Sequence, residues 1–98
     1  MSTATMLIYC PDEKGIILYV TNYISTNNGN IVDLDQHVDS EQKIFFMRVE
    51  WTLSNFNIPR ENIGAHFGSE VAKKYQMQYK VHFRDEKIRM ALMVSKMD

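Results

Sequence analysis

The hydrophobic positions divide the first third of the chain into a strand and a helix. Residues 3–10 are rich in strand-forming side chains, and they stop at Pro11, which lacks a ladder donor. Apolar residues then recur at spacings of three and four, which places them on one helical stripe: Ile16, Ile17, Val20, Tyr23 and Ile24. We expect the Asp12 carboxylate to cap this helix, and residues 28–30 (Asn-Gly-Asn) to form its left-handed end.

The next two segments predict a hairpin. Residues 30–39 alternate between apolar and mostly acidic side chains, and residues 44–51 alternate again after the polar stretch 40–43. If the turn is centred between residues 41 and 42, apolar side chains face one another and the polar ones pair on the opposite face. The expected pairs are Val38–Phe45, Leu34–Val49, Val32–Trp51 and Asp35–Arg48. A slip of one residue would expose the apolar set to water, so the register is well specified.

The second half predicts one more helix and one more strand. Pro59 suits a first helical turn, and apolar residues then repeat every four positions: Ile63, Phe67, Val71 and Tyr75. Gly64 and Gly68 lower helix propensity, which favours close packing of this helix on the sheet as the reason for them. Residues 78–84 alternate again, and three side chains are expected to point inward: Tyr79, Val81 and Phe83.

The resulting order is βαββαβ, which predicts an α+β domain of the ferredoxin-like type. Its four-stranded antiparallel sheet would carry both helices on one face. Residues 87–94 form a further apolar run, typical of a strand buried on both faces. We therefore expect residues 1–86 to form one domain, and residues 87–98 to be an extra C-terminal strand that begins a second, α/β domain. A fifth strand of the same sheet is the alternative.

Composition limits the classes of partner. The 98 residues include 11 basic and 12 acidic side chains, so the chain lacks the positive charge that supplies most nucleic-acid affinity or attracts an anionic membrane. Cys10 is the single cysteine and cannot form an internal disulfide. No signal-peptide pattern and no apolar run of about 20 residues is present. We expect a cytoplasmic protein that binds neither nucleic acid nor membrane.

The strands suggest two kinds of binding site, one for a metal ion and one for RNA, but an ordinary sheet surface is favoured over both. Alternate residues of the second strand could offer ligands to a hard metal ion: Asp33, Asp35, His37 and Asp39. Side chains two apart on a flat strand diverge, so a solvated or interface-facing sheet surface is favoured. Residues 43–49 faintly resemble the aromatic motif of RNA-recognition modules, but they lack its glycines. We expect no metal site and no cofactor.

The turn at residues 10–16 (CPDEKGI) is the most informative segment. Free backbone amides at the positive end of a helix form a natural seat for a carboxylate. Gly15 would let a ligand approach the backbone closely. A strand-to-helix turn without a ligand is the simpler alternative.

Several features together resemble the N-terminal ACT regulatory domain of the formyltetrahydrofolate deformylase family. They are the order βαββαβ, the CPDEKGI turn, the Asn-Ile-Val start of the second strand at 30–32, the acidic hairpin leading into FFMR at 45–48, and the run KIRMALMVSK at 87–96. The Pro-Asp-x-x-Gly-Ile pattern occurs in many ACT domains, whereas FFMR with the downstream run points to the deformylase. In that family, the segment corresponding to 87–96 opens a formyltransferase-like catalytic domain.

The resemblance implies a parent enzyme of one-carbon metabolism and purine biosynthesis, which hydrolyses 10-formyltetrahydrofolate to formate and tetrahydrofolate. Its catalytic residues would lie outside this chain, which should be inactive by itself. The resemblance also implies a regulatory domain that forms a homodimer or homotetramer and binds glycine or methionine as effector. The expected effector-binding residues are Asp12, Glu13, Lys14, Gly15 and Ile16, with Asn30 from a partner subunit. A free-standing ACT-like binding or oligomerisation module without enzyme activity is the alternative.

Overall fold

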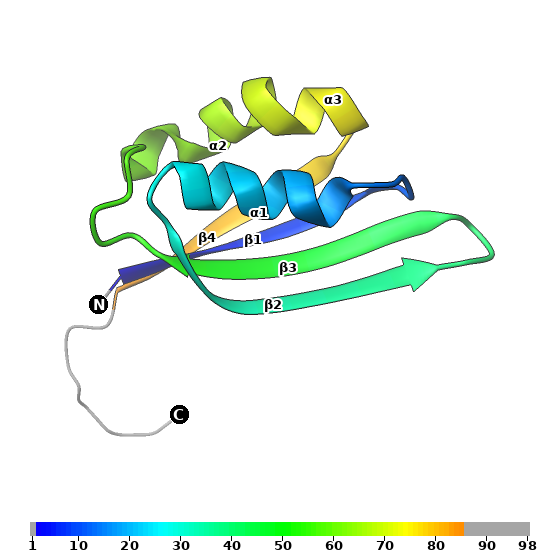
Figure 1. The fold of residues 1–98 in the computed structure, drawn as a ribbon, viewed down its shortest axis with the longest axis horizontal. Helices are drawn as coiled ribbons and strands as arrows, with labels where there is room; N and C mark the ends of the chain where they lie inside the picture. Colours follow the sequence, from blue (N-terminus) through cyan, green and yellow to red (C-terminus); the bar gives the residue numbers. More distant parts are fainter. Residues whose placement is uncertain (1, 86–98) are drawn as a thin grey trace.

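The computed structural model describes residues 2–85, which form four strands and two helical segments (Figure 1). In chain order the elements are β1 (Ser2–Pro11), α1 (Ile16–Thr26), β2 (Asn30–Asp39), β3 (Ile44–Thr52), the 3₁₀ turn η1 (Arg60–Asn62), α2 (Ile63–Phe67), the π-helical turn η2 (Gly68–Ala72), α3 (Lys73–Tyr75) and β4 (Gln78–Asp85). The segment from η1 to α3 is helical without a break. The extra strand and second domain expected at residues 87–98 lie outside the described residues.

The four strands form one antiparallel sheet in the order β2-β3-β1-β4. Both helical segments lie on the same face of this sheet (Figure 1). This is the ferredoxin-like α+β arrangement that the element order predicts, so the prediction of the fold class is confirmed.

The core lies between the sheet and the helices. Every second residue of β1 and β3 points toward the helices and is buried, as the period of two along a strand requires. The stripe of α1 and the four-residue repeat of the second helical segment cover these positions. The largest fully buried side chains are Trp51, Phe67, Met6, Ile16, Ile24, Ile63, Val20, Val49 and Val71.

The hairpin has the predicted register over most of its length. Three expected pairs are observed: Val38–Phe45, Leu34–Val49 and Asp35–Arg48. The register shifts between Ile31 and Asp33, so Ile31 lies opposite Trp51 in place of Val32. A β-bulge leaves its extra residue without a partner, and the Val32 side chain is 51% exposed. The prediction that Val32 faces Trp51 is therefore wrong.

The start of α1 differs from the prediction. Gly15 precedes the helix in a left-handed conformation (φ 85°), and no side chain caps the helix. The backbone N–H of Asp12 donates to the carbonyl of Lys43 (2.9 Å), which ties the end of β1 to the hairpin turn. The N-cap residue is thus Gly15 and not Asp12, which lies three residues upstream. The expectation that the Asp12 carboxylate caps the helix is wrong.

The other end of α1 has the left-handed stop that residues 28–30 predict. Asn28 is left-handed (φ 71°), its N–H donates to the carbonyl of Ser25 (3.0 Å), and the N–H of Gly29 donates to that of Ile24 (2.9 Å). These two bonds define a Schellman motif. A Cβ at Gly29 would lie 2.7 Å from Ile24 Cγ2 and 2.9 Å from Trp51 Cδ1, so packing requires glycine at this position.

A π-helical turn explains why apolar residues repeat every four positions in the second helical segment. Residues four apart advance by more than one turn of an α-helix, so a stripe with this spacing drifts around the axis. The wider π turn η2 reduces that drift, and the stripe stays on the sheet. A Cβ at Gly68 would collide with the hydroxyl of Tyr79, which confirms close packing at this glycine. No atom lies within 4 Å of a Cβ at Gly64, so the same explanation is wrong there.

Strand β4 closes one edge of the sheet. Tyr79 and Val81 pack against the core as predicted. Phe83 was expected to point inward, but it stays partly exposed and lies outside the core cluster. The guanidinium of Arg60 lies 5.0 Å from the Phe83 ring centroid and also pairs with Asp85. A charged side chain from η1 thus contacts this ring at the end of the sheet.

Candidate functional site

A hollow of about 510 Å³ lies between the start of α1 and the hairpin end of the sheet. The turn after β1 forms one wall, the first two turns of α1 form another, and β2 and β3 supply the third. The lining residues are Asp12, Glu13, Gly15, Ile16, Ile17, Leu18, Thr21, Gln36, Val38 and Phe45.

The backbone beside this hollow presents hydrogen-bond donors. The first bond between α1 and its cap runs from the N–H of Tyr19 to the carbonyl of Gly15 (3.0 Å). Because no side chain caps the helix, the amides of its first turn at residues 16–18 keep their donor capacity at the positive end of the helix. A Cβ at Gly15 would meet no atom within 4 Å, so the space beside this backbone is open.

The side chains around the hollow combine negative charge with apolar surface. Asp12 and Glu13 supply carboxylates, while Leu18 is 73% exposed and Val38 is also exposed. Burial, and then the nearby charges of Asp12 and Glu13, raise the pKa of the Cys10 thiol. Carboxylates, free amides and an apolar wall are the three groups needed to hold the ammonium, carboxylate and side chain of an amino acid.

The structure brings four of the predicted site residues together. Asp12, Glu13, Gly15 and Ile16 all line the hollow, whereas Lys14 belongs to the same turn but is not among the lining residues.

Asn30 lies at the opposite end of β2 from this hollow. It pairs with Thr52, whereas Val38, which lines the hollow, pairs with Phe45. Within a single chain Asn30 therefore stays away from the turn. Its predicted role requires a partner subunit, as the resemblance implies.

Sequence reasoning missed six lining residues of this hollow, namely Ile17, Leu18, Thr21, Gln36, Val38 and Phe45. Val38 was assigned to the core, but it is exposed at the edge of the sheet. The approach of β2 to the first turns of α1 depends on the tertiary arrangement, and no local pattern in the sequence announces it.

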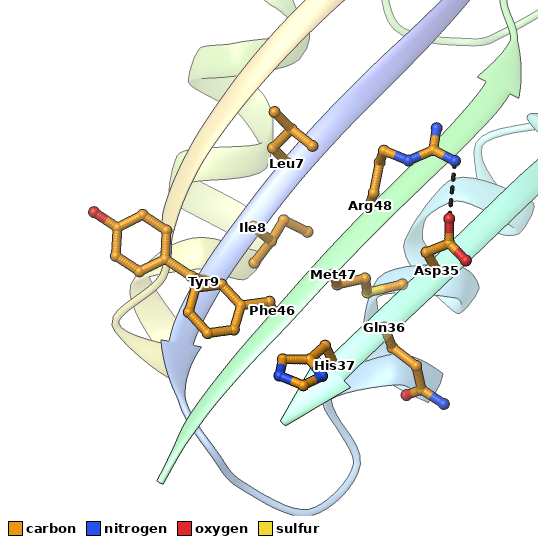
Figure 2. Close-up of a pocket in the computed structure, with 9 residues that line it drawn as sticks. All are labelled: Leu7, Ile8, Tyr9, Asp35, Gln36, His37, Phe46, Met47 and Arg48. Carbon is orange, nitrogen blue, oxygen red and sulfur yellow. Dashed lines mark hydrogen bonds and ion pairs between the residues drawn. The ribbon is translucent and has the colours of Figure 1, made fainter. Parts of the chain in front are cut away.

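The other face of the sheet carries a second candidate surface. Within residues 2–85, no element covers this face (Figure 1). Tyr9 is 49% exposed and Phe46 is 41% exposed, and their rings stack with centroids 6.1 Å apart. The ring of His37 lies 6.2 Å from that of Phe46, and Leu7 is exposed beside them. These side chains line a shallow hollow of about 360 Å³. Figure 2 shows how they lie on β1, β2 and β3.

Sequence reasoning missed this apolar patch, although a signal for it is present. Leu7 and Tyr9 occupy the strand positions that alternate with buried Met6 and Ile8. Phe46 likewise lies between buried Phe45 and Met47. Large apolar residues at the outward positions of two adjacent strands indicate a surface patch.

Charges flank the patch on its two sides. On β2, Asp33 and Asp35 both accept hydrogen bonds from Arg48 of β3. The Arg48 guanidinium lowers the pKa of the Asp33 carboxyl, chiefly by that hydrogen bond. On β4, at the opposite edge, the side chains of this face are polar or basic: Gln78, Lys80, His82 and Arg84.

A third hollow, of about 280 Å³, lies between the two helical segments. The hydroxyl of Tyr23 and Nδ1 of His66 are hydrogen-bonded at 2.6 Å. Burial, with a smaller contribution from the charge of Glu70, raises the pKa of Tyr23 to about 12. This pair joins the two helical segments above the core.

Residues 2–85 contain no group of three or more His, Cys, Asp or Glu side chains placed to hold a metal ion. In the same range, no helix has the length and apolar character needed to cross a bilayer.

Solved structures of formyltetrahydrofolate deformylases share this fold. A formyltetrahydrofolate deformylase from Pseudomonas syringae pv. tomato matches with a TM-score of 0.79 and 28% identity, over 85% of this chain and 28% of that one. A formyltetrahydrofolate deformylase from Burkholderia mallei matches with a TM-score of 0.73 over 84% of this chain and 28% of that one; at 17% identity it supports the fold alone.

Curated relatives carry the same name. The formyltetrahydrofolate deformylase of Synechocystis sp. is 42% identical over 96 residues, which is 98% of this chain and 34% of the relative. That of Bacillus subtilis is 32% identical over 93% of this chain and 30% of its own length. The chain matches the N-terminal part of formyltetrahydrofolate deformylase. It spans about a third of the length of these deformylases. No protein-family model matches it.

Proposed function

We propose that the chain is the regulatory, amino-acid-binding ACT domain of a formyltetrahydrofolate deformylase, an enzyme that hydrolyses 10-formyltetrahydrofolate to formate and tetrahydrofolate. One observation carries the proposal: the hollow at the start of α1 combines uncapped helix amides, two carboxylates and an apolar wall. The match to the N-terminal part of deformylases supplies the parent enzyme.

The bound effector would use each wall for one of its groups. Its carboxylate would accept hydrogen bonds from the amides of residues 16–18, where the open space beside Gly15 lets it approach. Its ammonium would contact Asp12 or Glu13. Lys14, in the same turn, would add positive charge near the carboxylate.

The apolar wall gives a preference between the two expected effectors. A methionine side chain could contact Leu18 and Val38, which otherwise expose apolar surface to water. Glycine has no side chain to place there. We therefore expect methionine to bind more tightly than glycine, although both would use the same charged groups.

Oligomerisation would complete the site. Asn30 is too distant within one chain to reach the hollow, so its side-chain amide would have to come from Asn30 of the partner subunit. The proposed regulatory unit is accordingly a homodimer or homotetramer in which a second chain contributes to effector binding.

Calorimetric titration with methionine and glycine tests the proposal. We expect heat of binding for methionine, and at least tenfold weaker binding in the variant that combines Asp12→Asn and Glu13→Gln. These substitutions remove charge without changing shape, so the Asp12 backbone bond to Lys43 is retained. Glu61→Gln, in η1, is the matched control and should leave binding unchanged. No heat for either amino acid at concentrations of about 5 mM would refute effector binding at this site.

A further inference from the structure

We propose that the uncovered face of the sheet packs on the same face of a second copy of this chain, across a two-fold axis that runs parallel to the strands. The inference rests on the oligomerising part of the proposed function and adds a second contact to it. In this pairing Asn30 of the partner subunit stays on the far side of the sheet from the hollow, so the contact that brings Asn30 to the hollow is a separate one, as a homotetramer would allow. The inference concerns a different surface from the effector hollow, since Leu7, Tyr9 and Phe46 lie on the opposite side of the sheet from α1 (Figures 1 and 2).

The cross-strand pairs divide this face into rows, each with one residue from every strand. One row is His37–Phe46–Tyr9–Gln78 and the next is Asp35–Arg48–Leu7–Lys80, in the order β2-β3-β1-β4. The third row is Asp33–Glu50–Thr5–His82. The apolar side chains of Leu7, Tyr9 and Phe46 therefore lie on the two central strands, beside Arg48 and Glu50 of β3, and the two edge strands carry only polar or charged side chains in these rows.

The two halves of this face differ in the sign of their charge. The β2–β3 half carries four carboxylates, of Asp33, Asp35, Asp39 and Glu50, against the single guanidinium of Arg48. The open-face side chains of the β1–β4 half include Lys80 and Arg84 and no carboxylate. This face is therefore acidic on one side of the apolar patch and basic on the other.

This asymmetry selects one of the two ways in which identical faces can pair. A two-fold axis along the strands lays β4 of one copy over β2 of the other and keeps each row opposite itself. Asp35 then faces Lys80 of the partner subunit, and the Phe46 ring faces Tyr9 of the partner subunit. An axis across the strands would instead set β2 on β2 and β4 on β4, with like charges opposed.

The area of the face suits a reversible dimer. Four strands of eight to ten residues, with strands about 4.8 Å apart and residues about 3.3 Å apart, give roughly 550 Å² per copy. The total of roughly 1,100 Å² is at the lower end of specific interfaces. Exposed aromatic rings at the centre of the patch are the side chains that most often anchor such contacts.

Sedimentation velocity on the 98-residue chain between about 5 and 500 μM tests the inference. We expect the mass to rise from monomer to dimer across this range. Phe46→Ser should raise the dissociation constant at least tenfold because it removes the central ring. Lys80→Glu should do the same by setting two carboxylates opposite each other at both symmetry-related contacts.

A charge exchange tests the axis itself. Adding Asp35→Lys to Lys80→Glu restores opposite charges across a strand-parallel axis, so we expect the double variant to return to within about fivefold of the wild-type dissociation constant. Lys73→Glu, on α3 in the helical layer, makes the same charge change away from the face and should have no effect. Near-UV circular dichroism confirms that each variant is folded.

Four outcomes separate this inference from its alternatives. A chain that stays monomeric at every concentration overturns it and leaves the face to another part of the longer deformylases. A dimer insensitive to Phe46→Ser and Lys80→Glu also overturns it, because the contact then lies at a sheet edge or on the helices. A double variant that fails to recover overturns the axis. Methionine binding by a chain that stays monomeric at every concentration would overturn the pairing while upholding the part of the effector site formed within one chain.

Discussion

The two faces of one sheet have opposite surroundings although both carry large apolar side chains. Met47 is 3% exposed on the helix-covered face, whereas Phe46, its neighbour along β3, is 41% exposed on the other. Burial in this sheet therefore follows the strand position of a residue and not its hydrophobicity. An apolar side chain at an outward position adds nothing to the core, and a cluster of such side chains is typical of a surface that contacts another molecule.

Truncating one aromatic residue on each side gives the largest expected difference. Phe67→Ala removes a fully buried ring and should lower the free energy of unfolding by about 3–5 kcal/mol. Phe46→Ala, on the open face, should cost less than about 1 kcal/mol in the monomer, because its ring is half in water. Urea denaturation at low protein concentration measures both. Equal losses would show that the open face contributes to the fold as much as the core does.

The two glycines of the second helical segment offer a matched pair on the covered face. Gly68→Ala should destabilise by roughly 1–3 kcal/mol, because the added methyl group displaces the Tyr79 hydroxyl from its 2.8 Å hydrogen bond to the carbonyl of Gly64. Gly64→Ala meets no atom within 4 Å and should stabilise by up to about 1 kcal/mol through helix propensity. Thermal melting of the two variants tests this, and changes of the same sign would contradict the packing described.

On the helix-covered side, the stability of the fold should also decrease at alkaline pH because of Tyr23. The pKa of Tyr23 is raised to about 12 in the folded chain from its usual 10, so the folded state holds the phenol proton more tightly. Its contribution is therefore complete below pH 10 and is lost as pH rises toward 12, to the extent of about 2 kcal/mol.

Tyr23→Phe tests that alkaline response. At neutral pH the variant should lose about 1 kcal/mol with the His66 hydrogen bond. Above pH 10 its stability should decline less steeply than that of the wild type. Some decline would remain, because the pKa of Cys10 is raised as well. Urea midpoints from neutral pH upward provide the measurement, and parallel curves for the two proteins would rule out the phenol as the cause.

The smallest expected effect concerns the open face, where the ion pair of Asp33 and Arg48 should influence stability at acidic pH. Arg48 lowers the pKa of Asp33 from its usual 3.8, so this carboxylate stabilises the fold above that pH and ceases to do so as pH falls below it. Because the pair is exposed, Asp33→Asn should only slightly reduce the acid dependence of the urea midpoint. A large loss at neutral pH would indicate that the ion pair has a structural role.

The parts of the fold that follow from periodicity were predictable from the sequence. Alternation set the faces of β2 and β3, and three of four hairpin pairs are confirmed because a slip would expose Leu34 and its partner Val49. The bulge at Val32 was not predictable, because it changes the register without changing the composition of the strand. The capping role of Asp12 failed because the helix begins later, after the left-handed Gly15, which takes the N-cap position.

In the candidate site, too, the residues that are adjacent in sequence were predictable, and those brought together by the fold were not. Asp12, Glu13, Gly15 and Ile16 line one hollow because they are neighbours in a short turn, and sequence reasoning found them. Gln36 and Val38 join them only because β2 runs past the start of α1. Positions brought together by tertiary contact carry no local signal, so the apolar wall that distinguishes methionine from glycine became visible only in the structure.

The π turn η2 has a consequence for changes in chain length. The wider turn accommodates about one more residue than a turn of α-helix does, so removing one residue between positions 68 and 72 would give a regular α-helix and leave α3 in phase with α2. Tyr75 would then stay near the ring of Tyr19, whose centroid lies 5.5 Å away. This segment should therefore tolerate a one-residue deletion within η2 better than a deletion in a regular α-helical turn, where the residues that follow would rotate by about 100° around the axis.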